Sequence, residues 1–73
     1  MRTRGATIEK DNNSGFSVVE VWDDAPDGVK KLIGYVILDK DGNEIGFFTD
    51  IGEALGEFKR FSDDAEHEQP SPN

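Results

Sequence analysis

The apolar positions between residues 16 and 48 fall into three short runs, which are separated by turn signals. Residues 16–22 and 31–38 are rich in β-branched and aromatic side chains, a composition that favours strands. A Pro-Asp-Gly sequence separates these two runs, and Asp41-Gly42, typical of a hairpin turn, precedes a third run at 44–48. Together they predict an antiparallel sheet, with residues 31–38 as its central strand because they are apolar on both faces.

Residues 6–10 are a candidate for a further strand, joined to the first run by a turn-rich segment. A helix is predicted after Asp50, because Asp50 and Glu53 have the spacing of a capping box. The apolar residues that follow recur at helical spacing and form one stripe. The predicted fold class is therefore α+β, an antiparallel three- to four-stranded β-meander packed by one C-terminal helix. The stripe consists of Ile51, Ala54, Leu55, Phe58 and Phe61.

The charge is strongly acidic and unevenly distributed along the chain. The 73 residues include sixteen Asp and Glu against eight Lys and Arg, a net charge of −8. The last twelve residues contain four acids and no base, so residues 62–73 are predicted to be a disordered acidic tail. Residues 1–61 form the predicted single domain, with twelve acids and eight bases, a net charge of −4. The folded part is thus expected to be acidic in its own right.

Composition narrows the classes of function. The chain has no Cys, which excludes thiolate catalysis and disulfides and fits the reducing cytosol. No apolar run approaches the roughly 18 residues of a membrane span, and residues 1–4 are not followed by the apolar stretch of a signal peptide. A pI near 4.4 argues against direct binding to nucleic-acid phosphates or anionic lipid. We therefore expect a cytoplasmic protein that contacts neither membrane nor nucleic acid.

A calcium site is one interpretation of the loop at 39–44. Asp39, Asp41 and Asn43 stand at positions 1, 3 and 5 of an EF-hand-like loop, with Asp50 at position 12. Glu44 stands where that loop requires Gly, and the flanking segments are predicted strands instead of helices. The favoured interpretation is a polar hairpin loop, and no metal or cofactor is expected.

Catalytic residues are not evident in the sequence. Acid–base catalysis requires two carboxyl groups held in a cleft with separated pKa values, and nothing marks such a pair here. The single His67 lies in the acidic tail without a partner. We expect the protein not to be an enzyme.

Two kinds of side chain are candidates for contact with a partner. Phe47 and Phe48 are adjacent in a strand, so one of them must point away from the helix. That face is either closed in part by the N-terminal segment, with Trp22 at its margin, or it is a surface for a partner or a second copy. The apolar candidates for the contact are Trp22, Tyr35 and Phe48.

The carboxylates are the second kind of candidate. Same-face positions repeat at about 6.6 Å in a strand and helical neighbours lie about 5–6 Å apart, which is comparable to the spacing of nucleic-acid phosphates. Acidic residues also maintain solubility, and both interpretations stay open. The candidates near the loops are Asp23, Asp24, Asp27, Asp39, Asp41 and Glu44, and those on the helix are Glu53 and Glu57.

Residues 34–55, from Gly34-Tyr35 through Asp41-Gly42-Asn43 to Glu53-Ala54-Leu55, resemble the hairpin-then-helix unit of many short bacterial and phage proteins. The small size, acidity and lack of catalytic residues also resemble the anti-CRISPR proteins of phages and mobile elements. That group has no common motif, so no functional residue is carried over.

The resemblance implies a phage-encoded inhibitor that blocks a basic nucleic-acid-binding surface of a bacterial defence complex, such as a CRISPR effector. The alternatives are an antitoxin or immunity-like protein that neutralises a basic toxin, and a small structural or calcium-binding module.

Overall fold

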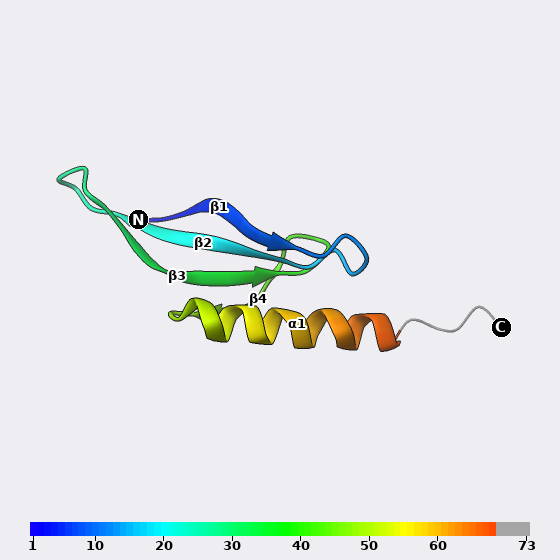
Figure 1. Ribbon diagram of the computed structural model, residues 1–73. Helices are drawn as coiled ribbons and strands as arrows, with labels where there is room; N and C mark the ends of the chain where they lie inside the picture. The colour runs from blue at the N-terminus through cyan, green and yellow to red at the C-terminus, as the bar shows by residue number, and fades with distance from the viewer. Residues whose placement is uncertain (69–73) are drawn as a thin grey trace.

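The computed structural model describes the backbone of residues 1–68 and the side chains of residues 1–64. Four strands precede one helix (Figure 1). The predicted α+β meander with a C-terminal helix is confirmed. The elements are β1 (Arg2–Lys10), β2 (Ser17–Asp24), β3 (Lys30–Leu38), β4 (Glu44–Phe48) and α1 (Ile51–Glu68).

The strands form one sheet in the order β1-β2-β3-β4, and each neighbouring pair is antiparallel. β3 lies between β2 and β4, as its apolar composition predicts. The hairpin turns use Gly28 and Gly42, whose φ values of 84° and 85° lie in the left-handed region that favours glycine. β1 begins at Arg2, four residues before the predicted strand, because its first half pairs with the end of β2.

α1 begins as the capping pattern predicts. The Asp50 Oδ2 accepts a hydrogen bond from the Glu53 backbone N–H at 3.0 Å, although the Glu53 carboxylate makes no return bond among the described residues. Ala54 and Phe58 of the predicted stripe are buried. Ile51 departs from the prediction, because at the first position of the helix its side chain stays 41% exposed.

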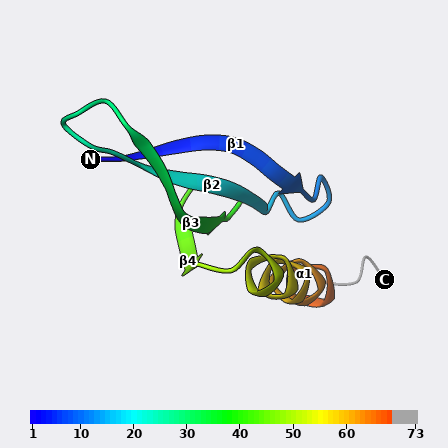
Figure 2. The same cartoon turned by 60° about the vertical axis from the view of Figure 1, so that its left-hand side comes forward.

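The main core lies between α1 and one face of the sheet. Val18, Ile37 and Ala54 are fully buried there, and Phe58 is 8% exposed. Figure 2 views α1 nearly end-on and shows it against one side of the curved sheet. Six partly buried side chains surround this core: Ile8, Phe16, Tyr35, Phe48, Leu55 and Phe61.

A second, smaller core lies apart from the helix. Val19, Val21 and Val36 are buried, with Ile33 and Leu38 packed against them. Successive residues of a strand point to opposite faces, so Val19 must face away from the helix that Val18 contacts. No helix covers this second core in the described part of the chain, and side chains of the sheet itself bury it.

The predicted tail boundary at Ser62 is wrong for the residues that the structure describes. α1 continues to Glu68, and Ser62 is buried against the β1–β2 loop, with its Oγ 3.5 Å from that of Ser14. The apolar stripe ends at Phe61, but helical backbone continues because nothing in residues 62–68 breaks it. Residues 69–73 of the predicted tail lie outside the described residues.

Removing one methyl group from the main core should destabilise the fold measurably. We expect Ile37→Val to lower the free energy of unfolding by about 0.5–1.5 kcal/mol, because the fully buried side chain loses packing contacts. Ile45→Val is the matched control, since Ile45 is 38% exposed on β4. Urea denaturation measures both. Equal losses in the two variants would contradict this assignment of the core.

Candidate functional site

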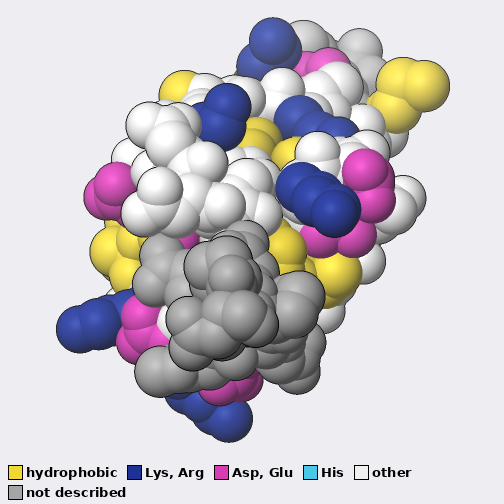
Figure 3. Space-filling view, turned by 90° about the vertical axis from the view of Figure 1, so that its right-hand side faces the viewer, with side chains coloured by type: hydrophobic (Ala, Val, Ile, Leu, Met, Phe, Trp, Pro, Cys, Tyr) yellow, Lys and Arg dark blue, Asp and Glu magenta, His cyan; other side chains and the backbone are white. Residues whose placement is uncertain are grey.

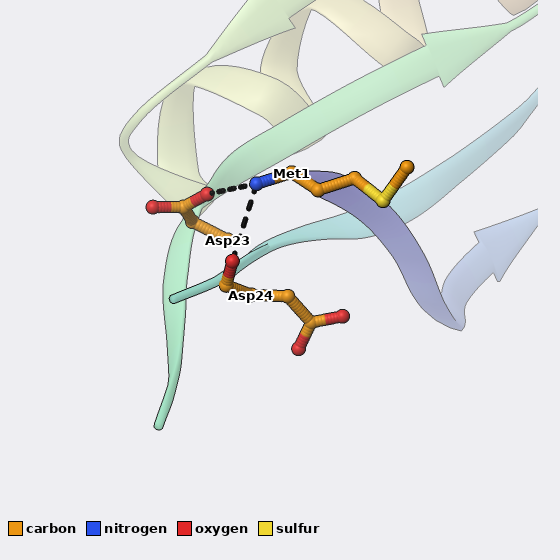
Figure 4. Close-up of polar contacts among 3 residues, drawn as sticks. All are labelled: Met1, Asp23 and Asp24. Atoms are coloured by element: carbon orange, nitrogen blue, oxygen red, sulfur yellow. Dashed lines mark hydrogen bonds and ion pairs between the residues drawn. The ribbon is translucent and has the colours of Figure 1, made fainter. Parts of the chain in front are cut away.

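The predicted acidic residues at the hairpin end of β2 are partly neutralised. The Met1 amino group lies 3.1 Å from the Asp23 Oδ1 and 3.2 Å from the Asp24 carbonyl oxygen (Figure 4). Across the β2–β3 ladder, Asp23 stands opposite Lys31 and Asp24 opposite Lys30. At this end of the sheet, acidic side chains therefore lie beside positively charged groups.

Two predicted aspartates hold turns in shape. The Asp27 Oδ1 accepts a hydrogen bond from the Val29 N–H at 3.0 Å. The Asp39 Oδ1 accepts from the N–H groups of Asp41 and Asn43, at 2.9 and 2.8 Å. Aspartate commonly bonds to the backbone two residues on, which fixes a tight turn. These two carboxylates are structural parts of the loops that carry them.

Hydrogen bonds within the loops lower the pKa of two partly exposed carboxyl groups, those of Asp39 and Asp11. The backbone N–H of Asn43 is the main cause that holds the pKa of Asp39 below its ordinary value. The hydroxyl of Ser14 does the same to the pKa of Asp11, helped by the backbone N–H of Asn13. Hydrogen bonds therefore hold both carboxylates in fixed positions and favour their ionised form.

The residues that suggested a calcium site have other roles in the structure. Asp39 accepts the hydrogen bonds of its own loop, and Asp50 caps α1. The loop is flanked by β3 and β4, not by helices. The part of the chain that the structure describes contains no group of three or more His, Asp or Glu side chains placed to hold a metal ion.

Glu44 takes part in a clasp across the face of the sheet that α1 does not cover. The Arg4 Nη2 lies 3.0 Å from the Glu44 Oε2, and the Arg2 guanidinium lies 5.2 Å from the centre of the Phe47 ring. Arg2 and Arg4 belong to β1, whereas Glu44 and Phe47 belong to β4, the opposite edge strand. The N-terminal segment thus closes part of this face, as one sequence interpretation holds. We call these four side chains the clasp.

The two helix acids do not form a free acidic pair. Glu53 is exposed, but the Glu57 Oε1 lies 2.9 Å from the Arg60 Nη1, one turn further along. An exposed pair of this kind adds little stability, but it offsets one of the two charges. The outer face of α1 is therefore less acidic than the sequence pattern indicates.

The aromatic candidates occupy different places. Tyr35 and Phe48 pack against the main core, so Phe47, at 41% exposure, is the phenylalanine that faces away from the helix. Phe47 lies over Gly34, where an added Cβ would come within 2.6 Å of its Cζ. The adjacent pair Phe47-Phe48 predicts that one ring is exposed, but only the strand register decides which.

Trp22 is held in position by β1 and by its own strand. Its Nε1 donates to the Glu20 Oε1 at 3.3 Å, and its ring lies against Gly5. A Cβ at Gly5 would lie 2.5 Å from the Nε1 and 2.7 Å from the Cδ1 of the ring. The ring is half-buried at the margin of the sheet.

Acidic side chains of α1 and of two loops come together at one end of the described structure. Ser14 and Ser62 bring the β1–β2 loop to α1, and a Cβ at Gly15 would lie 2.7 Å from the Cβ of Lys40 in the β3–β4 loop. Five carboxylates from three distant segments therefore lie at one end of the molecule. This loop-end surface consists of Asp11, Asp39, Asp41, Asp63 and Asp64.

The loop-end surface retains a net negative charge after its cations are counted. Its five acids are accompanied by Lys10 at the end of β1 and Lys40 in the β3–β4 loop, a net charge of −3, and including Lys59 of α1 leaves −2. At the hairpin end, three acids are balanced by two lysines and the Met1 amino group. Figure 3 looks onto the loop end and shows acidic and basic side chains interspersed. Sequence reasoning missed Asp11, Asp63 and Asp64, because only the fold brings them to Asp39 and Asp41.

The described hollows are small and lie around the start of β1. One of about 120 Å³ is lined by all four members of the clasp, and one of about 200 Å³ lies beside Trp22 and Lys30. Pockets for small molecules usually measure about 300–1,000 Å³. Neither hollow brings two carboxylates together.

Comparisons with protein families, curated proteins and solved structures find no match to this chain. Among the residues that the structure describes, no helix is long and apolar enough to cross a membrane.

The lowered pKa of Asp39 makes part of the stability depend on pH. Because the folded pKa lies below the unfolded value of 3.8, this contribution is fully present above that unfolded value and is lost as the pH falls through the folded pKa. We expect Asp39→Ala to lower the urea midpoint of unfolding at pH 7. The difference in midpoint between the variant and the wild type should shrink as the pH falls. Asp41→Ala, which removes no side-chain hydrogen bond, is the control. A deficit of constant size from pH 7 to pH 2 would contradict this role.

The contact between Gly5 and Trp22 predicts opposite effects for two glycine substitutions. Gly5→Ala should displace the only tryptophan, which shifts its fluorescence emission and lowers stability, because the added Cβ meets the ring. Gly56→Ala meets nothing within 4 Å on α1 and should raise stability by up to about 1 kcal/mol. Unchanged emission in Gly5→Ala would contradict the placement of the ring.

Proposed function

We propose that the protein is a non-enzymatic inhibitor that binds a basic nucleic-acid-binding surface of another protein through its loop-end surface. The observation that carries the proposal is the gathering of five carboxylates from three segments at one end of the fold. We further propose that the target belongs to a bacterial defence complex of the kind that anti-CRISPR proteins block, and that the protein acts in the cytosol.

The state of the loop-end carboxylates supports this proposal. Asp11 and Asp39 are fixed in position by hydrogen bonds within their loops. A partner therefore meets negative charges that are already positioned, which reduces the ordering cost of binding. Exposed Asp41, Asp63 and Asp64 add charge around them. Lysine and arginine side chains that hold nucleic-acid phosphates would pair with such an array.

The excess charge of the whole chain supports the same mechanism. A net charge of −8 attracts a basic partner over several ångströms and speeds the encounter. Because this attraction is screened by salt, binding to the partner should weaken as ionic strength rises.

Charge reversal at the loop end tests the proposal. Asp41→Lys combined with Asp64→Lys should weaken binding at least about tenfold, or about 1.4 kcal/mol, because two attractions become repulsions. Neither side chain makes a hydrogen bond among the described residues, so the fold should be retained. Asp24→Lys combined with Glu53→Lys makes the same charge change elsewhere and is the matched control.

The binding measurement uses affinity capture from bacterial lysate, identification of the retained protein, and challenge of the complex with a DNA duplex and an RNA. Nucleic acid should displace the bait, and the loop-end variant should capture less than the control. A plasmid-interference assay in cells with an active CRISPR system then tests the proposed target class. The proposed surface would be refuted if the loop-end variant and the control lost partner binding equally. It would also be refuted if neither DNA nor RNA displaced the captured protein.

A further inference from the structure

The large apolar side chains that remain exposed are concentrated on one side of the sheet. Apart from Met1, all of them within the described residues belong to the β2–β3 hairpin, to β4 or to the first residue of α1. None belongs to β1, the opposite edge strand. They are Val29, Leu32, Ile45, Phe47 and Ile51.

This side of the sheet has a gap in its strand pairing. β4 pairs with β3 only from Tyr35 to Leu38, whereas β2 pairs with β3 along its whole length. Residues 30–34 of β3 therefore have no strand beside them on the β4 side. Five residues span about 16 Å, and Figure 1 shows the hairpin end of β2 and β3 extending past β4 and α1. We call residues 30–34 the open edge.

The other edge of the sheet is protected against pairing. β1 carries charged residues at both ends and has two irregularities in its register with β2. Charges and bulges of this kind keep edge strands from joining other strands. The open edge has lysines only at its start and continues with exposed Leu32, half-buried Ile33 and buried Gly34, which the end of β4 approaches. An extended strand can therefore add to it.

The charge pattern favours a second copy of the chain as that strand. Residues 28–38 are the longest stretch without an acid and contain two lysines. Two copies at −8 each can approach here without opposing carboxylates. Antiparallel pairing centred on Leu32 sets Lys30 opposite Gly34 of the other copy, so the lysines do not face one another.

The same arrangement brings opposite charges together. A Cβ at Gly34 would lie 2.6 Å from the Phe48 carbonyl oxygen, so the chain passes close to Gly34 two residues before Asp50. Lys30 of one copy would then lie within reach of Asp50 of the other, twice by symmetry. Leu32 of each copy would meet its equivalent near the axis, with the exposed Phe47 and Ile51 nearby.

We propose that two copies of this chain associate through antiparallel pairing of their open edges, forming one continuous sheet about a two-fold axis. The interface is isologous, as in most homodimers. It is also short, so the dimer is expected to be weak and to form at high protein concentration. The inference does not depend on the loop-end surface, and purified protein alone tests it.

Sedimentation equilibrium over a wide concentration range is the first test. The dimer should strengthen as salt rises, because screening reduces the repulsion between two chains of −8. This is the opposite of the salt dependence expected for a basic partner. Leu32→Glu should raise the dissociation constant of the dimer at least tenfold. Thr7→Glu on exposed β1 makes the same charge change and should leave the dissociation constant unchanged. A monomer at every concentration and salt would overturn the proposal.

Amide hydrogen exchange gives a second test that needs no variant. Amides within residues 30–34 should gain protection as the concentration of wild-type protein rises, while amides of β1 should not. Protection that is independent of concentration, or that appears only when a strand of another protein is added, would overturn pairing with a second copy. A dimer in which β1 gains the protection would also overturn it.

Discussion

The close approach of α1 to the sheet is the contact on which the rest of the structure depends. Ala54 lies against Val18 and Ile37, and all three are fully buried. Because Ala54 is small, the helix axis can come near the sheet, and Phe58 fills the space one turn further along. The chain has 73 residues, 34% of them hydrophobic, and α1 is the one helix among residues 1–68 that can supply a large core against the sheet. The direction of α1 also carries its later turns to the β1–β2 loop, where Ser62 meets Ser14.

The uncovered face of the sheet is stabilised in a different way. Val19, Val21 and Val36 are buried there although no helix of the described structure lies over them. The clasp joins β1 to β4 across this face with one ion pair and one cation–aromatic contact. Each interaction is weak at an exposed site. Their position matters more than their strength, because they connect the two edge strands of the sheet.

The fold separates two surfaces with different physical character. The loop-end surface holds ionised carboxylates and suits a partner of opposite charge. The open edge includes the exposed Leu32, has no strand paired with it on the β4 side, and lies in the longest acid-free stretch of the chain. Since one surface relies on long-range charge and the other on short-range burial and backbone pairing, salt should affect them in opposite directions. The two proposals are therefore compatible in one molecule.

Local signals in the sequence determined the elements of this fold. The Asp-Gly turn fixed the β3–β4 hairpin, β4 has the predicted bounds of 44–48, and Asp50 caps the helix as its spacing with Glu53 predicts. Each of these features depends on residues within a few positions of one another, which is the range over which turn and capping chemistry acts. The end of the helix was predicted less well, because burial of Ser62 requires a residue 48 positions away.

Only the tertiary structure decided which side chains share a surface. The sequence contains every acid of the loop-end surface, but strand pairing brings the loops of Asp11 and Asp39 together and the packing of α1 adds Asp63. The same is true of Arg4 and Glu44, forty residues apart. Periodicity predicted that one of Phe47 and Phe48 faces away from the helix, and strand register selected Phe47. The sequence thus determined local geometry and net charge, whereas long-range packing determined where that charge and the exposed apolar residues gather.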